Sequence, residues 1–174
     1  MQALMLRIQQ RDPTALSDLY DLFSSKVYSL TAMILGEDMA AQEVTQDVFM
    51  KVWDRPESYR DEQGKFASWL LTVARRSAID RLRRENRQFL IAASLDDDEF
   101  PQLRDFAEDD ETRWRELRLL MDELPPDQRE TLVLSFYRGL SQSDISAYLN
   151  VPLGTIKTRM KLAMDKLRVA WRRG

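Results

Sequence analysis

The chain of 174 residues contains no cysteine and no histidine. Disulfides, thiolate zinc sites and imidazole catalysis are therefore excluded. Glycine-rich phosphate-binding loops are also missing, so we predict no catalytic activity, no metal site, no cofactor and no small-molecule substrate. The five glycines and six prolines are too few for the frequent turns of a β-sandwich or barrel. This scarcity favours an all-α fold.

Long apolar runs are missing too. No segment reaches the length of about 18 apolar residues that predicts a membrane-spanning helix. The first residues, MQALMLRIQQRD, lack the basic start and apolar core of a signal peptide. The absence of cysteine fits a reducing compartment. We therefore expect a cytoplasmic protein without direct membrane insertion.

Charge is present but unevenly placed along the chain. The net charge is -3 and the hydrophobic share is 44%, which is enough for packed cores. Residues 1–93 carry 13 basic and 13 acidic side chains, residues 94–112 carry nine acidic side chains and one arginine, and residues 113–174 carry 12 basic and seven acidic side chains. This layout predicts two small helical domains, 1–93 and 113–174, joined by an acidic linker.

The first domain is predicted to begin with a long helix at Asp12-Pro13. Aspartate caps free backbone N–H groups, and proline is tolerated at the first helical position. Apolar residues then recur at spacings of three and four until Gly36, which indicates one buried helix face. These residues are Leu16, Leu19, Tyr20, Phe23, Val27, Leu30 and Ile34.

Two further helices are predicted in this domain, on either side of a charged surface loop at 54–65. The first covers residues 39–53 and buries Val44, Val48 and Val52. The second covers residues 66–87. Its expected inward residues are Phe66, Trp69, Leu70 and Val73.

The second domain is predicted to contain a helix that stops at Pro125-Pro126 and another that Gly139 ends. Ser141 and Asp144 then resemble a capping box at the start of a short helix, and the turn Asn150-Val151-Pro152 leads to a final helix. The expected inward residues of these last two helices are Ile145, Tyr148, Leu149, Ile156, Met160, Ala163, Leu167 and Ala170.

These last two helices have the layout of a helix-turn-helix, whose second helix enters the major groove of DNA. Lysine and arginine can meet phosphates or guanine edges there, and threonine can meet a phosphate or a thymine methyl group. An ordinary amphipathic hairpin with a solvated basic face is the alternative. The candidate DNA-binding residues of the final helix are Thr155, Lys157, Thr158, Arg159, Lys161 and Leu162.

A second basic stripe ends the predicted helix at 66–87. Six arginines fall within 13 residues there, which suits contact with a polyanion. Arginines near the end of a helix also stabilise its dipole, so a solvated helix end is the alternative. Two basic helices in two domains indicate two separate contacts on one nucleic acid. The candidate residues of this stripe are Arg75, Arg76, Asp80, Arg83, Arg84 and Arg87.

Three blocks of the sequence resemble bacterial RNA polymerase sigma factors of the extracytoplasmic function group in the sigma-70 family. The blocks are AAQEVTQDVFMKVW at 40–53, GKFASWLLTVARRSAIDRLRR at 64–84, and LPPDQRETLVLSFYRGLSQSDISAYLNVPLGTIKTRMKLAMDKLR at 124–168. Their order and separation match that family over nearly the whole chain. The resemblance implies a promoter-specificity subunit that binds core RNA polymerase and promoter DNA.

The resemblance also assigns tasks to residues of this chain. It implies that the first block binds core polymerase, with Gln46, Asp47, Met50 and Lys51 as candidate contacts. It implies that the second domain recognises the minus-thirty-five element. It implies that the loop at 54–65 and the following helix capture and melt the minus-ten element, which adds Tyr59 and Arg60 to the arginine stripe. A role for Tyr59 as an anchor of the core is an equal alternative.

Two other functions stay open at the level of sequence. One is a transcriptional regulator that binds duplex DNA alone, although this leaves the face from Gln46 to Lys51 unexplained. The other is a helical interaction module with incidental basic faces. For a sigma factor, the resemblance further implies a separate anti-sigma protein as the inhibitor. Met50, Leu162 and Trp171 are the apolar residues expected at the surface for such a partner.

Overall fold

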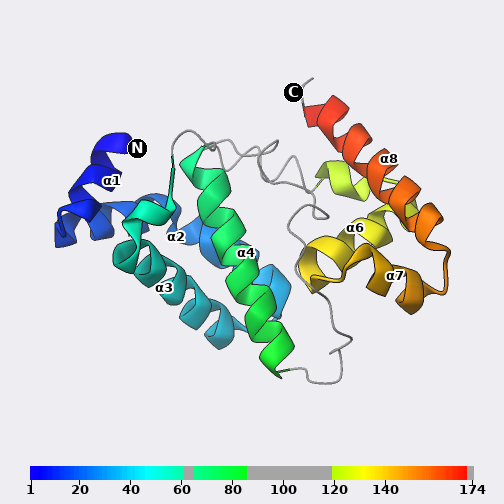
Figure 1. Cartoon of the computed structure of the whole chain (residues 1–174), viewed down its shortest axis with the longest axis horizontal. Coiled ribbons are helices and arrows are strands. Elements are labelled where there is room, and N and C mark those ends of the chain that lie inside the picture. The colour runs from blue at the N-terminus through cyan, green and yellow to red at the C-terminus, as the bar shows by residue number, and fades with distance from the viewer. Residues whose placement is uncertain (61–64, 86–118, 172–174) are drawn as a thin grey trace. The chain divides into compact units, whose positions relative to one another are not determined.

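The computed structural model describes residues 1–60, 65–85 and 119–171, and every element in these ranges is a helix (Figure 1). The chain divides into two compact units, Met1–Glu85 and Asn86–Gly174, each of which is described by itself. The predicted all-α fold is confirmed. The predicted acidic linker, 94–112, lies outside the described residues.

In its described residues, 1–60 and 65–85, the first unit contains four α-helices and one short 3-10 helix. Figure 1 shows how these elements follow one another along the chain. Helix α2 packs against both α3 and α4, which also contact each other, while α1 packs on α2. The 3-10 helix contacts α1 and α3. The elements are α1 (Gln2–Gln9), α2 (Pro13–Leu35), α3 (Asp38–Asp54), η1 (Pro56–Ser58) and α4 (Phe66–Glu85).

Both ends of α2 lie where the sequence predicts them. The Asp12 carboxylate accepts a hydrogen bond from the backbone N–H of Thr14 at 2.9 Å, and Pro13 occupies the first helical position. At the other end Gly36 has φ = 72°, a left-handed conformation that glycine adopts without a Cβ clash. These local signals set the length of the central helix.

Helix α1 was not predicted, because we placed the first helix start at Asp12. Its Met5 and Ile8 are buried, and Arg7 forms ion pairs with Asp12 at 2.8 Å and Asp18 at 2.9 Å. The turn after α1 places Arg11 at φ = 63°. From there the Arg11 guanidinium donates to the backbone oxygen of Trp53 at 2.6 Å and lies 5.4 Å from its ring centroid.

The core of the first unit follows the predicted helical periodicity. Val44, Val48 and Val52 are all buried on α3. Tyr20 was wrongly placed in the core: it is 41% exposed, and its ring packs on Phe49 with 4.9 Å between centroids. Its position at the edge of the apolar stripe allows one side of the ring to contact the core while the other meets water.

A buried polar contact joins α2 to α3. The hydroxyl oxygens of Thr31 and Thr45 are 3.1 Å apart, and Thr45 also donates to the backbone oxygen of Ala41 at 2.7 Å. Both threonines are at most 3% exposed. Their hydroxyl groups are satisfied by each other and by backbone oxygens, as burial requires.

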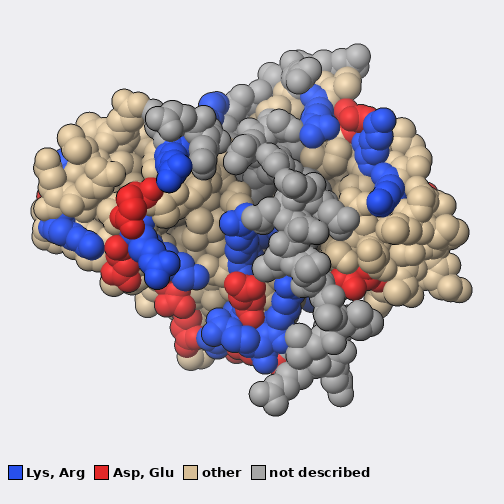
Figure 2. Space-filling view, in the orientation of Figure 1, with Lys and Arg blue, Asp and Glu red and all other residues tan. Residues whose placement is uncertain are grey.

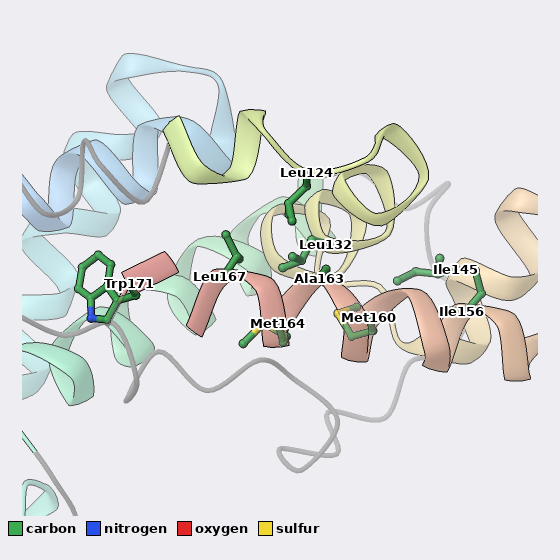
Figure 3. Packing of buried hydrophobic residues seen from close by; sticks show 9 residues of the cluster. All are labelled: Leu124, Leu132, Ile145, Ile156, Met160, Ala163, Met164, Leu167 and Trp171. Atoms are coloured by element: carbon green, nitrogen blue, oxygen red, sulfur yellow. The ribbon is translucent and has the colours of Figure 1, made fainter. Parts of the chain in front are cut away.

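The second unit begins, within the described range, with a helical segment at residues 119–122. It continues with α6 (Pro126–Arg138), α7 (Gln142–Leu149) and α8 (Leu153–Trp171). Helix α8 packs against α6 and α7. The buried cluster contains Leu124, Leu132, Ile145, Ile156, Met160, Ala163, Met164, Leu167 and Trp171 (Figure 3).

Two predictions for this unit are wrong. Tyr148, expected inside, is 60% exposed, and Trp171, expected at the surface for a partner, is only 6% exposed. In the short helix α7, Asp144 and Ile145 are buried and Leu149 packs against the cluster, which leaves Tyr148 on the exposed side. The indole of Trp171 instead extends the buried side of α8 by one turn beyond Leu167.

Within the three described ranges, none of the helices combines the length and the apolar character needed to cross a bilayer.

Candidate nucleic-acid interface

Helices α7 and α8 form a helix-turn-helix whose local geometry follows from the sequence. The Ser141 hydroxyl accepts from the backbone N–H of Asp144 at 3.2 Å, and the Asp144 carboxylate accepts from the backbone N–H of Ser141 at 3.1 Å. This is the predicted capping box. Asn150 ends α7 at φ = 53°, and Ser146 donates to the backbone oxygen of Val151 at 2.6 Å. The turn between the helices is therefore fixed.

Helix α8 has one buried face and one exposed face. Its buried residues are Ile156, Met160, Ala163, Met164, Leu167 and Trp171. At about 100° per residue, the opposite direction falls on Thr158 and Leu162, both of which are exposed. Exposed Lys157 and Lys161 lie towards one flank of this face, and Arg159 lies towards the other. Thr155 is exposed as well, beside the start of the helix.

One predicted DNA contact, Arg159, is already paired within the protein. Its Nε lies 3.1 Å from Oδ2 of Asp127, in the first turn of α6, and its side chain is 24% exposed. The other oxygen of Asp127 accepts from the backbone N–H of Gln128 at 3.0 Å. Asp127 therefore holds Arg159 at the flank of α8.

Thr158 is also engaged within the helix. Its hydroxyl donates to the backbone oxygen of Gly154 at 2.9 Å. A threonine hydroxyl has one hydrogen to donate, so this bond uses it. A Cβ added at Gly154 meets nothing within 4 Å, which means that the surface beside Thr158 is open.

Five predicted residues of the first unit, Asp47, Lys51, Asp80, Arg83 and Arg84, line one groove between α3 and α4. The groove has a volume of about 510 Å³. The contacts Lys51–Ser77 and Glu43–Arg81 show that the two helices run antiparallel along it. Figure 2 shows acidic and basic side chains side by side over these helices. The lining residues are Val44, Asp47, Lys51, Ser77, Asp80, Arg81, Arg83 and Arg84.

Charges in this groove are partly neutralised. Lys51 Nζ donates to the Ser77 hydroxyl at 2.8 Å. Arg81 pairs with Glu85 on its own helix and with Glu43 of α3, where Nη1 and Oε2 are 3.1 Å apart. The hydrogen bond with Glu85, more than the contact with Glu43, raises the pKa of Arg81 above its already high value. The guanidinium of Arg81 therefore ties α4 to α3.

The remaining predicted residues of the first unit differ in exposure. Gln46 and Met50 are exposed on α3. Arg60, after η1, and Arg76, on α4, are exposed as well. Arg75 is buried, with 6% of its surface exposed. Arg87 lies outside the described residues.

Tyr59 belongs to an aromatic cluster. Its ring centroid is 5.0 Å from that of Phe66 and 5.5 Å from that of Trp69. This arrangement supports the anchoring role that we kept as an alternative. The side chain is half-buried, so part of its surface still meets solvent.

The two units match two family models. Residues 19–88 match Sigma-70 region 2, and residues 120–169 match Sigma-70, region 4. The chain is 34% identical, over 97% of its length and 87% of the relative's length, to the ECF RNA polymerase sigma factor SigK of Mycolicibacterium vanbaalenii. This chain belongs to the ECF sigma factor family.

Other similarities extend over most of this ECF sigma factor. It is 31% identical to SigK of Mycobacterium bovis, over 97% of this chain and 91% of that protein. Among solved structures, it resembles Rhodobacter sphaeroides SigE in complex with the anti-sigma ChrR, with 26% identity, a TM-score of 0.45, and coverage of 95% of this chain and 94% of that chain.

The matched regions place both candidate surfaces of this ECF sigma factor. Region 2 covers α3 and α4 with their groove, and region 4 covers α7 and α8. Helix α1 and Arg11 lie before the first match.

Sequence reasoning missed four residues that organise these surfaces: Glu43, Ser77, Arg81 and Asp127. The first three depend on the antiparallel pairing of α3 and α4, which one sequence does not reveal. Asp127 carried a weak signal, since an acidic residue after Pro125-Pro126 suits the first turn of a helix. Nothing in the sequence indicated that Asp127 would pair with Arg159.

Proposed function

We propose that this ECF sigma factor is a promoter-specificity subunit that binds core RNA polymerase and directs initiation at a dedicated set of promoters. One observation carries the DNA-binding part: α8 turns Thr158 and Leu162 outward between cationic flanks within a helix-turn-helix. The region 4 match covers the same helix. No catalytic step is assigned to the chain itself.

The proposed target of α8 is the minus-thirty-five element. Lys157 and Lys161 are exposed and suit phosphates of one strand, while Arg159 on the other flank suits the opposite strand. Phosphate contacts of this kind orient a protein on DNA, whereas base edges determine sequence preference. Thr155, Thr158 and Leu162 are left for the base edges of the major groove.

The proposed target of the first unit is the minus-ten element together with core polymerase. Arg76, Arg83 and Arg84 supply cations along α4, next to Asp80 at the groove. Gln46, Asp47 and Met50 are exposed on α3, which suits them to a protein partner. Lys51 belongs to both proposed surfaces, because it lies on α3, the proposed polymerase-binding helix, and donates a hydrogen bond to Ser77 of α4.

We also propose an anti-sigma protein as a partner and the cytoplasm as the site of action. Met50 and Leu162 are 49% and 45% exposed, and an inhibitor that covers them would block both proposed surfaces. The sigma factor SigE of Rhodobacter sphaeroides was solved with such a protein. Specific interfaces of this type bury on the order of 1,600 Å².

Run-off transcription from genomic fragments tests the proposed function. Core polymerase is assayed with and without the purified chain, and specific transcripts that need both components are the expected result. A variant with alanine at Lys157 and Lys161 should lose most of these transcripts while keeping its affinity for core. Specific DNA binding by the chain alone, with no effect of core, would instead identify a stand-alone regulator.

A further inference from the structure

We infer that the centre of α8 recognises the 5-methyl group of thymine through Thr158 and Leu162. The inference rests on the proposed function, since it specifies which base-pair feature the promoter-bound helix selects. It starts from two neighbouring side chains, one turn apart, at the middle of the exposed face. Neither of them has a hydrogen-bond donor to offer.

Thr158 has used its donor inside the protein. Its hydroxyl hydrogen is directed to the backbone oxygen of Gly154 at 2.9 Å. The acceptors in the major groove, guanine O6 and N7, adenine N7 and thymine O4, all require a donor. Thr158 therefore offers its methyl group and the lone pairs of its hydroxyl oxygen. An A·T pair offers a partner for both, because its major-groove edge presents the adenine N6 amino group as a donor and the thymine methyl as an apolar group.

Leu162 extends this apolar strip. It is 45% exposed and has no polar atom, so its favourable contact in the groove is with another apolar group. The thymine methyl is the apolar group among the base edges of the major groove. Access is open, because a Cβ at Gly154 meets nothing within 4 Å. The strip lies in the N-terminal half of α8, the part of a recognition helix that contacts bases.

The charges around the strip favour DNA over an apolar protein partner as its occupant. Lys157 and Lys161 lie on one flank and Arg159 on the other, which matches two phosphate strands bordering a groove. Asp165 follows on the exposed face and pairs with Arg168 at 3.6 Å. Its carboxylate repels phosphates, so it marks the end of the contact region.

Deoxyuridine substitution tests the inference. The holoenzyme, reconstituted from core polymerase and the full chain, first selects promoter duplexes from a random-sequence library. Each thymine of the selected upstream element is then replaced singly by deoxyuridine, which removes the methyl group and keeps the base pairing. We expect about fourfold weaker binding at one or two positions, the loss that corresponds to one buried methyl group.

Two variants and a control assign the effect to residues. Leu162→Ala should abolish the difference between thymine and deoxyuridine at one position. Thr158→Ser keeps a hydroxyl for Gly154 but lacks the methyl group, so it should abolish the difference at the neighbouring position. Val169→Ala is the matched control, because Val169 is 51% exposed on α8 beyond Asp165. It should leave the discrimination unchanged.

The possible outcomes separate this inference from the proposed function. Equal binding of thymine and deoxyuridine duplexes by the wild-type holoenzyme would overturn the inference and leave the proposed function intact. The same holds if discrimination persists in both Leu162→Ala and Thr158→Ser, or if the selected element contains no A·T pair. A holoenzyme that selects no sequence at all would overturn the proposed function, and the inference with it.

Discussion

Arg159 of α8 and Asp127 of α6 form an ion pair in which Nε and Oδ2 are 3.1 Å apart. The other oxygen of Asp127 accepts a hydrogen bond from the backbone N–H of Gln128. This second bond orients the carboxylate that Arg159 contacts. The pair links the first turn of α6 to the candidate recognition helix. It therefore orders a long cationic side chain before DNA is bound.

The first prediction concerns this pair. Arg159→Ala should reduce the slope of log affinity against log salt by about one, because one phosphate contact is lost. Asp127→Asn keeps the cation, so it should leave the slope nearly unchanged and lower only the affinity. Promoter-duplex binding by the holoenzyme over a salt series measures both, with Glu130→Gln on the same helix as the control. Tighter binding by Asp127→Asn would show that Asp127 restrains Arg159 rather than positions it.

The second prediction concerns the capping box of α7. Ser141→Ala removes the acceptor for the backbone N–H of Asp144 and should destabilise the helix-turn-helix by about 1 kcal/mol. Faster amide hydrogen exchange over residues 142–171 would show it. Ser143→Ala is the control, because Ser143 lies two residues further along and is exposed. Identical exchange in the two variants would count against a stabilising box.

A third prediction follows from the left-handed backbone of Arg11. Replacing it by alanine or glycine removes the contacts with Trp53 equally, but only glycine relieves the positive φ of 63°. Arg11→Gly should therefore be more stable than Arg11→Ala by about 1 kcal/mol. The adjacent Gln10 has φ = -79°, so Gln10→Gly should not be more stable than Gln10→Ala. Denaturant unfolding of the four variants measures their free energies of unfolding. A less stable Arg11→Gly than Arg11→Ala would contradict the prediction.

The fourth prediction is a pH dependence at Asp12. Hydrogen bonds from the Thr14 side chain and then from Arg7 lower the pKa of Asp12 from 3.8 to about 2. Because the pKa is lower in the folded state, the stabilisation is complete above about pH 4 and is lost as the pH falls towards 2. Asp12→Asn should therefore lose less stability than wild type between pH 4 and pH 2. Asp21→Asn, exposed on the same helix, should behave like wild type.

The fifth prediction separates the polymerase-binding residues from the groove. Reversing the charges at Asp47 and Lys51 together keeps the net charge and should weaken core binding roughly tenfold or more, if these residues lie at the centre of the interface. Ser77→Ala removes only the hydroxyl that Lys51 contacts and should leave core binding intact. Titration of core polymerase with labelled protein measures both. Unchanged affinity of the charge-reversal variant for core polymerase would show that Asp47 and Lys51 are not contacts.

Much of the fold was predictable because its signals are local. Asp12 and Pro13 begin α2, Gly36 ends it, and Ser141 with Asp144 begins α7. Each acts on backbone groups within a few residues of itself. The buried stripe of α8 was equally accessible, because a helix core needs only apolar residues at spacings of three and four.

The missed features depend on contacts between distant residues. Helix α1 is short, and its stability comes from Met5 and Ile8 packing on α2 rather than from its own sequence. The groove exists because residues 44–51 and 77–84 meet on antiparallel helices. Tyr148 fits the apolar pattern of α7, but Ile145 and Leu149 supply the contacts of that helix with the core and Tyr148 is left exposed. None of these follows from spacing in one sequence.

The buried contact between Thr31 and Thr45 has a consequence for the groove on another side of α3. If α3 slid along α2 by one helical turn, the hydroxyl contact between Thr31 and Thr45 and the bond from Thr31 to the backbone oxygen of Ala41 would both be lost. Each hydroxyl keeps a backbone acceptor in its own helix, so the loss is that of ordinary hydrogen bonds, about 0.5–1.5 kcal/mol each. The threonine pair therefore favours the observed axial register of α3. That register determines which residues of α3 stand opposite α4. A buried hydroxyl pair thus helps to determine which charged side chains of α3 and α4 lie opposite each other at the surface.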